Sequence, residues 1–118
     1  MKFIEYEIQC NAVAWMRLQY PNAILHSIPN GARVGIRQAV RLKKEGLLKS
    51  IPDVFVAQAN TDYHGIYAET KRPGAKPNRD QKIMMERLSN RGYFVFWYDN
   101  LEDFIHKIKW YMKLDKEE

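Results

Sequence analysis

The segment that decides the fold is residues 50–81, SIPDVFVAQANTDYHGIYAETKRPGAKPNRDQ. It contains two short apolar runs, residues 54–57 (VFVA) and 66–68 (IYA), on either side of a polar stretch, residues 60–65, rich in turn-forming side chains. Two β-prone runs around such a break predict an antiparallel hairpin. We expect its turn to centre near Asp62, which would set residue 53 opposite residue 71 and residue 55 opposite residue 69.

Three charged side chains then meet at the open end of the predicted hairpin: Asp53, Glu69 and Lys71. Side chains two apart on a strand share a face and lie about 6.5 Å apart, so Glu69 and Lys71 point one way and Thr70 points the other. Two carboxylates suit a divalent cation, because Mg²⁺ takes one or two protein carboxylates and fills its other positions with water and phosphate oxygen. Beside such a metal, Lys71 could orient or help deprotonate the attacking water and offset charge on a phosphate.

The spacing P-D-(x15)-E-x-K, from Pro52 to Lys71, resembles the signature of the PD-(D/E)XK nucleases. Further motifs stand in order around it, with Pro29-Asn30-Gly31 upstream and Gln81 followed by Arg91-Gly92 downstream. The whole order is similar to the virus-type replication-repair nuclease (VRR-NUC) domain over roughly residues 5–105. P-D and E-x-K alone are a weak signal, and the ordered set makes the resemblance specific.

The resemblance implies a metal-dependent DNA endonuclease that hydrolyses phosphodiester bonds with Mg²⁺ or Mn²⁺. Asp53 and Glu69 would hold the metal, with the carbonyl of Thr70 as a further ligand. Lys71 would position the nucleophilic water, and Gln81 would orient that water or Lys71. The fold that it implies is α/β, a restriction-endonuclease-like core.

Two of the implied site residues also have plain structural interpretations. Gln81 follows Asn78 by three residues, so it could be the partner of a helix capping box rather than a site residue. The resemblance also implies an acid in the first helix close to the metal, which Glu5 matches, with Glu7 as the alternative. An acid in a first helical turn is otherwise a favourable partner of the helix dipole.

The net charge of +5 is concentrated on both sides of the predicted site. Residues 30–50 contain six bases against one acid, and residues 71–91 contain seven bases against two acids. Basic patches that bracket carboxylates indicate a polyanionic partner, with DNA favoured, although basic helix faces are often only solvated. The residues chosen as nucleic-acid contacts are Arg37, Arg41, Lys44, Arg72 and Lys76, and the resemblance adds Asn30 in a loop bordering the site.

Periodicity along the chain predicts the element order α-β-α-β-β-α-β-α and a mixed sheet of about four strands flanked by helices. The first helix spans residues 3–20, with an apolar stripe of Ile4, Ile8, Ala12 and Trp15 that Ala14 and Leu18 widen. The second runs from residue 35 or 36 to residue 48, and the last covers about residues 100–114. Residues 93–98 are so apolar that they predict a central strand covered on both faces.

Length and composition favour one domain over residues 1–118. The single cysteine, Cys10, excludes an intrachain disulfide framework. The chain opens without a signal-peptide pattern and contains no apolar run long enough to span a bilayer, so we expect a soluble, cytoplasmic protein without a membrane partner.

One small site cuts one strand at a time, so cleavage of two strands would need a symmetric dimer. By resemblance, stand-alone members process branched DNA such as four-way (Holliday) junctions or flaps in DNA repair, which favours a homodimer here. One alternative function is a non-catalytic nucleic-acid-binding module on a nuclease fold. Another is an RNA- or DNA-binding regulator unrelated to this fold.

Overall fold

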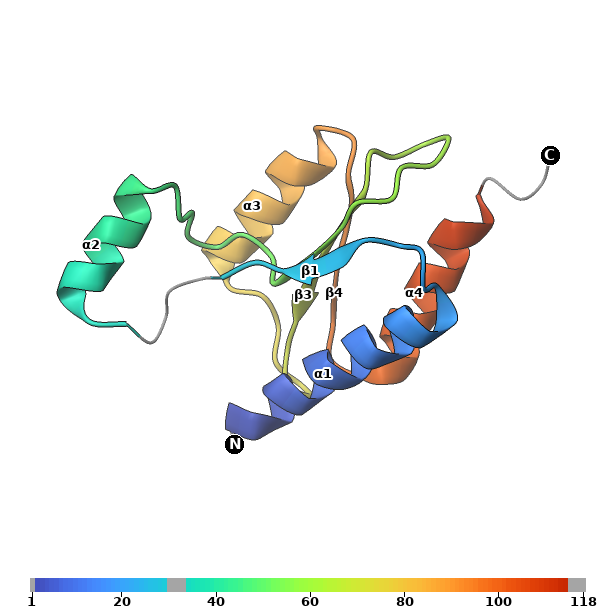
Figure 1. Cartoon of the computed structure of the whole chain (residues 1–118), viewed down its shortest axis with the longest axis horizontal. Helices are drawn as coiled ribbons and strands as arrows, with labels where there is room; N and C mark the ends of the chain where they lie inside the picture. The colour runs from blue at the N-terminus through green and yellow to red at the C-terminus, as the bar shows by residue number, and fades with distance from the viewer. Residues whose placement is uncertain (1, 30–33, 115–118) are drawn as a thin grey trace.

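The computed structural model describes residues 2–29 and 34–114. The predicted order of helices and strands is confirmed, and Figure 1 shows their arrangement. In chain order the elements are α1 (Lys2–Gln19), β1 (Leu25–Ser27), α2 (Ile36–Lys44), β2 (Val54–Val56), β3 (Ile66–Thr70), α3 (Arg79–Ser89), β4 (Phe94–Tyr98) and α4 (Leu101–Lys113). The largest difference in length is at α2, which ends four residues earlier than predicted, just before Gly46 with φ +113°.

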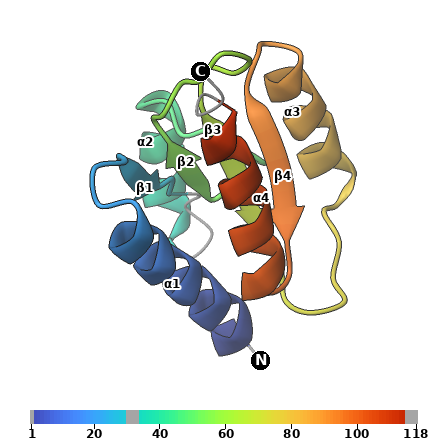
Figure 2. The same cartoon turned by 90° about the vertical axis from the view of Figure 1, so that its right-hand side faces the viewer.

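The strands form the predicted mixed sheet, in the order β1-β2-β3-β4. β1, β2 and β3 pair antiparallel, and β4 pairs parallel to β3. In Figure 2, α1 and α4 lie in front of this sheet, while α2 lies behind it and α3 beside β4. β3 therefore has both α1 and α3 beside it, two helices that come from distant parts of the chain.

The prediction that residues 93–98 form a central strand is wrong. β4 is the last strand in the sheet of the described chain, and it pairs with β3. Both α3 and α4 pack against it. The apolar sequence of β4 reflects these two covering helices and not a place in the middle of the sheet.

The predicted register of the hairpin is also wrong. The observed partners are Val54 with Ala68, Phe55 with Tyr67, and Val56 with Ile66. The side-chain oxygen of Asn60 accepts the backbone N–H groups of Asp62 and Tyr63, at 2.9 and 2.8 Å, and this turn is centred one residue earlier than predicted. Extending the observed pairing by one step brings Asp53 opposite Glu69, closer than the prediction placed it.

The core lies between the sheet and helices α1 and α4. Its buried residues are Ala12, Met16, Leu25, Val54, Val56, Ile66, Ala68, Phe96, Tyr98, Phe104, Ile108 and Tyr111. On α1, Ala12 and Met16 are buried whereas Ala14 is exposed and Leu18 is 85% exposed, so the predicted widening of the apolar stripe is wrong. Across residues 2–29 and 34–114, no helix is both long and apolar enough to cross a membrane.

Helix α2 differs from the other helices because none of its residues is buried. Its apolar side chains Ile36 and Val40 are 86% and 48% exposed. Figure 1 shows the helix at one end of the molecule, set apart from the other helices. α2 is thus a basic element carried by the fold rather than a part of its core.

Candidate active site

Asp53 is held in place immediately before β2. Its Oδ2 atom accepts the backbone N–H of Thr70 at 2.9 Å, and its carbonyl oxygen accepts the N–H of Ile28 at 2.7 Å. The hydroxyl of Thr70 in turn donates to the hydroxyl of Tyr98 at 2.6 Å within the buried core. Asp53 is therefore fixed through its backbone and its side chain to two neighbouring strands and, through Thr70, to a third.

Glu69 lies across from Asp53 near the end of β3 and is only 3% exposed. One of its oxygens, Oε2, accepts the side-chain N–H of Gln81 at 3.1 Å and lies 3.5 Å from the Nζ atom of Lys71. The structure thus brings Asp53, Glu69, Lys71 and Gln81 together, although they span nearly 30 positions of the sequence.

Gln81 is both the capping-box partner of α3 and a contact of the site carboxylate Glu69. Its Oε1 atom accepts the backbone N–H of Asn78, and Asn78 Oδ1 accepts the N–H of Gln81, both at 2.9 Å, which makes the capping box of α3. Its Nε2 atom is turned the other way and donates to Glu69. A single amide therefore begins the helix and orients a site carboxylate.

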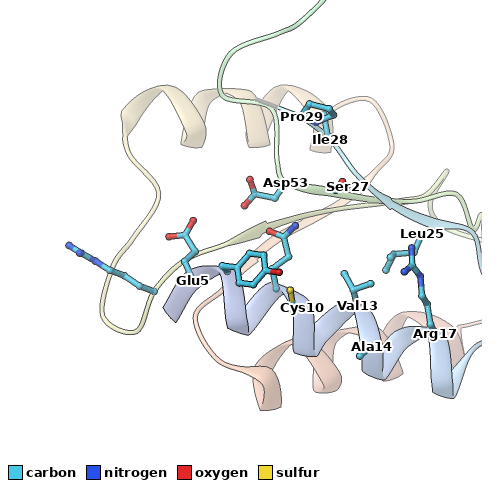
Figure 3. A pocket seen from close by; sticks show the side chains of 13 residues that line it. Glu5, Cys10, Val13, Ala14, Arg17, Leu25, Ser27, Ile28, Pro29 and Asp53 are labelled. Carbon is cyan, nitrogen blue, oxygen red and sulfur yellow. The ribbon is translucent and has the colours of Figure 1, made fainter. Parts of the chain in front are cut away.

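Glu5 extends from α1 toward the same site. Figure 3 shows its carboxylate and that of Asp53 facing one open space. Both residues line a groove of about 940 Å³ that also includes Arg72. Glu7 is exposed on another side of α1 and does not line this groove. Between the two acids that the sequence left open, the geometry favours Glu5.

The carboxylates of the site repel each other. Burial, followed by the nearby charge of Asp53, raises the pKa of Glu69 to about 8, although the ammonium of Lys71 opposes the shift. Burial also raises the pKa of Asp53, against the hydrogen bond from Thr70, and Glu5 adds to the increase. A cation placed among these groups would offset the repulsion.

The donor set fits a divalent metal of the Mg²⁺ or Mn²⁺ type. Oxygen ligands suit these ions, and Mg²⁺ is commonly held by one or two carboxylates with water and phosphate oxygens completing its shell. No three acidic, histidine or cysteine side chains in the described chain come together as a metal site. The two carboxylates that could supply such a site are those of Asp53 and Glu69.

The remaining predicted residues lie on two different supports. Arg72 lies beside the acids, in a loop that is held by a 3.1 Å hydrogen bond from the N–H of Gly74 to the carboxylate of Asp99. Lys76 is exposed in the same loop. The three chosen residues of α2, Arg37, Arg41 and Lys44, are all exposed. Asn30 lies outside the described residues.

Ser50, two residues before the P-D pair, has an unusual backbone conformation. Its φ of +67° lies in the left-handed region that glycine adopts most easily. The serine keeps the loop geometry at some cost in stability.

Tyr6 and Arg17 of α1 are among the groove residues that lie outside the motifs. They share a helix face with Cys10 and Val13, since the four positions are separated by four, three and four residues. That spacing was available in the sequence. It could not be assigned to a site because the groove also needs β1.

Comparison with known proteins bears on this geometry. The model of the VRR-NUC domain matches residues 2–99. The chain belongs to the VRR-NUC family. A solved structure described as a VRR_NUC domain protein superposes with a TM-score of 0.76 at 24% identity, covering 94% of this chain and 89% of that chain. A search of curated proteins found no match. The chain therefore has a nuclease-type fold, and a regulator with an unrelated fold is excluded.

Proposed function

We propose that this VRR-NUC protein is a metal-dependent DNA endonuclease that hydrolyses phosphodiester bonds. One observation carries the proposal. Asp53 and Glu69 lie opposite each other at the end of the sheet, and Lys71 and Gln81 contact Glu69 at 3.5 and 3.1 Å. A site that only bound DNA would gain nothing from buried carboxylates, because they repel the phosphates that it has to hold.

Each residue has a role that follows from its place. Asp53 and Glu69 would hold Mg²⁺ or Mn²⁺, with the carbonyl of Thr70 as a further ligand. When bound, such a metal activates water and offsets charge on the phosphate. Lys71 would position the water and stabilise the developing negative charge, since its ammonium stands beside Glu69.

Two further side chains would support this centre. Gln81 would keep the Glu69 carboxylate in a fixed orientation, since its amide is itself fixed by the capping box of α3. Glu5 would contribute to the outer part of the metal shell from the opposite wall of the groove. Neither role requires Gln81 or Glu5 to touch the scissile bond.

DNA would be held by basic side chains around the acids. Arg72 lies in the groove with Asp53, and Lys76 follows in the same loop. The exposed bases of α2, Arg37, Arg41 and Lys44, would contact phosphates of the backbone. Asn30, in the loop that the resemblance sets at the border of the site, would touch the substrate. Contacts of this kind position the nucleic acid without reading its sequence.

We further propose that the substrate is branched DNA, such as a junction or a flap, and that the active form is a homodimer. One chain carries one such group of acids among its described residues and would cut one strand. Cutting two strands of a junction would take two sites related by a twofold axis.

The test is cleavage of labelled four-way junctions, flaps and linear duplexes with Mg²⁺, Mn²⁺ or EDTA. We expect the protein to cleave branched DNA only when Mg²⁺ or Mn²⁺ is present. Asp53→Asn should lower the rate about 10³-fold, because metal activation supplies several kcal/mol and about 1.4 kcal/mol corresponds to tenfold. DNA binding without metal should change by less than about threefold.

Glu102→Gln is the matched control, since this acid is exposed at the start of α4 and does not line the groove. Its cleavage rate should equal that of the unmodified protein. Binding without any metal-dependent cleavage would favour the alternative, a non-catalytic binding module. Normal cleavage by Asp53→Asn would overturn the assignment of the site.

A further inference from the structure

The groove beside the acids continues well beyond them. It is formed by one face of α1 and by the chain around β1, and Figure 3 shows Glu5 and Asp53 near one end and Arg17 toward the other. The rest of the lining includes Leu25 and Ile28. A metal and one phosphate would occupy only the end at the acids, which leaves most of the groove without a role in the proposed hydrolysis.

The length of the groove can be estimated from α1. Glu5 and Arg17 are twelve residues apart on this helix, which corresponds to about 18 Å at 1.5 Å per residue. One strand of nucleic acid advances about 3.4 Å per nucleotide, so this distance matches roughly five nucleotides.

The chemistry of the lining changes along that length. Arginines stand at both ends. Figure 3 shows Arg17 at the far end, and Arg72 lines the end with the acids, since it directly follows Lys71, which contacts Glu69. The surface between them is partly apolar, with Val13 from α1 near Leu25 in Figure 3 and Ile28 also in the lining. Tyr6, which is 66% exposed, adds an accessible aromatic ring near the acids.

A groove with arginines at its ends and apolar and aromatic side chains between them suits an unpaired strand better than a duplex. Only unpaired bases expose the flat apolar faces that stack on aromatic side chains, while their phosphates still require cations. A protein helix would match the apolar centre but would gain nothing from arginines at both ends.

We propose that the groove between α1 and β1 binds a single-stranded segment of DNA, about five nucleotides long, that leads away from the cut. Tyr6 stacks on a base near the cut, and Arg17 contacts a phosphate at the far end. The inference rests on the proposed function and adds to it an unpaired strand next to the scissile bond. It assigns a substrate role to two residues outside the nuclease motifs.

The experiment measures binding without metal, so that it does not depend on cleavage. Fluorescent oligothymidylates of about two to ten nucleotides are titrated with the protein in EDTA, and anisotropy is recorded. Affinity should rise with length up to about five nucleotides and then level off. Arg17→Glu should lower the affinity for an eight-nucleotide strand about tenfold and leave that for a two-nucleotide strand unchanged, whereas Arg17→Lys should keep most of the affinity.

Tyr6 gives a second and independent arm. Tyr6→Ala should lower affinity about tenfold at every length, because stacking contributes roughly 1–3 kcal/mol, and Tyr6→Phe should restore it. Arg87→Glu is the matched control, since it makes the same change of charge at an exposed position on α3 that does not line the groove. Its affinity should fall by less than about twofold. Melting temperatures of all variants confirm that the fold is intact.

Equal affinities for Arg17→Glu and the unmodified protein at every length would overturn the inference. Equal losses for Arg17→Glu and Arg87→Glu would also overturn it, because the effect would then be one of net charge. If affinity rises with oligonucleotide length as expected but no DNA is cleaved, the groove binds single-stranded DNA and the proposed hydrolytic function is wrong. If DNA is cleaved but affinity does not depend on oligonucleotide length, the hydrolytic function stands and the inference about the groove is wrong.

Discussion

The acids at the end of β3 and the bases of α2 are held in opposite ways. Glu69 is 3% exposed and is fixed by Gln81 and Lys71, and Asp53 is fixed by the N–H of Thr70. α2 has no buried residue, and its basic side chains extend into solvent. Charges that must act at a defined position need such a packed frame. Charges that contact phosphates along a flexible polyanion do not, and a helix outside the core is sufficient for them.

Removing the bases of α2 tests whether this helix serves DNA binding and not the stability of the fold. Arg37→Ala combined with Arg41→Ala should weaken DNA binding about tenfold at low salt and reduce the slope of log K against log [salt] by about 1.8, since each phosphate contact contributes about 0.9. The melting temperature should stay the same because no residue of α2 is buried. Anisotropy titrations at several salt concentrations measure both quantities.

The matched control removes two exposed bases of α4, with Lys109→Ala combined with Lys113→Ala. This variant loses the same charge from another part of the surface and should keep a salt slope close to that of the unmodified protein. A melting temperature that falls with the α2 substitutions would show that α2 supports the fold, and the contrast between the two regions would fail.

A smaller effect should come from the buried acids when no metal is added. The pKa of Glu69 is raised from 4.5 to about 8 in the folded protein, so folding favours its protonated form. Its contribution to stability is therefore complete below about pH 4.5 and is lost as the pH rises toward about 8. In EDTA the melting temperature should fall by several degrees between these limits. Glu69→Gln should reduce that fall.

The control for this titration is Glu102→Gln, an exposed acid whose removal should leave the pH dependence unchanged. Mn²⁺ should raise the melting temperature at pH about 8, because a ligand that binds only the folded state stabilises it. If the melting temperature of Glu69→Gln fell with pH as much as that of the unmodified protein, the repulsion would not involve the Glu69 carboxylate.

The smallest expected effect concerns the loop that leads into the site. Ser50 has φ +67°, a conformation that is less favourable by about 1–2 kcal/mol for residues other than glycine. Glycine loses about 0.5–1 kcal/mol more chain entropy on folding, so Ser50→Gly should stabilise the protein by about 0.5 kcal/mol. Urea unfolding measures the difference.

Ser89→Gly provides the comparison, since Ser89 is the last residue of α3. Glycine in a helix is less favourable than serine by about 0.5 kcal/mol, so this change should have the opposite sign. If the two substitutions changed the free energy of unfolding in the same direction, the backbone conformation at residue 50 would have no part in the stability of the loop.

Short-range signals in the sequence were sufficient for the order of the elements. The Asn78 and Gln81 pair indicated where α3 begins, and the apolar runs around the P-D and E-x-K motifs indicated β2 and β3. These signals work because capping and strand formation depend on residues a few positions apart. The residue types of the candidate site followed from the same motifs.

What the sequence did not give depends on contacts between distant segments. The register of the hairpin differs from the prediction because the side chain of Asn60 tightens the turn. The apolar sequence of β4 reflects its two covering helices, although the strand lies at the edge of the sheet. The second bond of Gln81 requires α3 to lie against the end of β3, and the groove requires α1 beside β1. No local pattern reports such neighbours.

Calorimetric titration of Mn²⁺ into the metal-free protein measures whether Asp53 and Glu69 hold one divalent cation between them. We expect uptake of one ion per chain, with affinity at least about tenfold weaker in Asp53→Asn and in Glu69→Gln and unchanged in Glu102→Gln. Uptake of the same strength in all four proteins would contradict it.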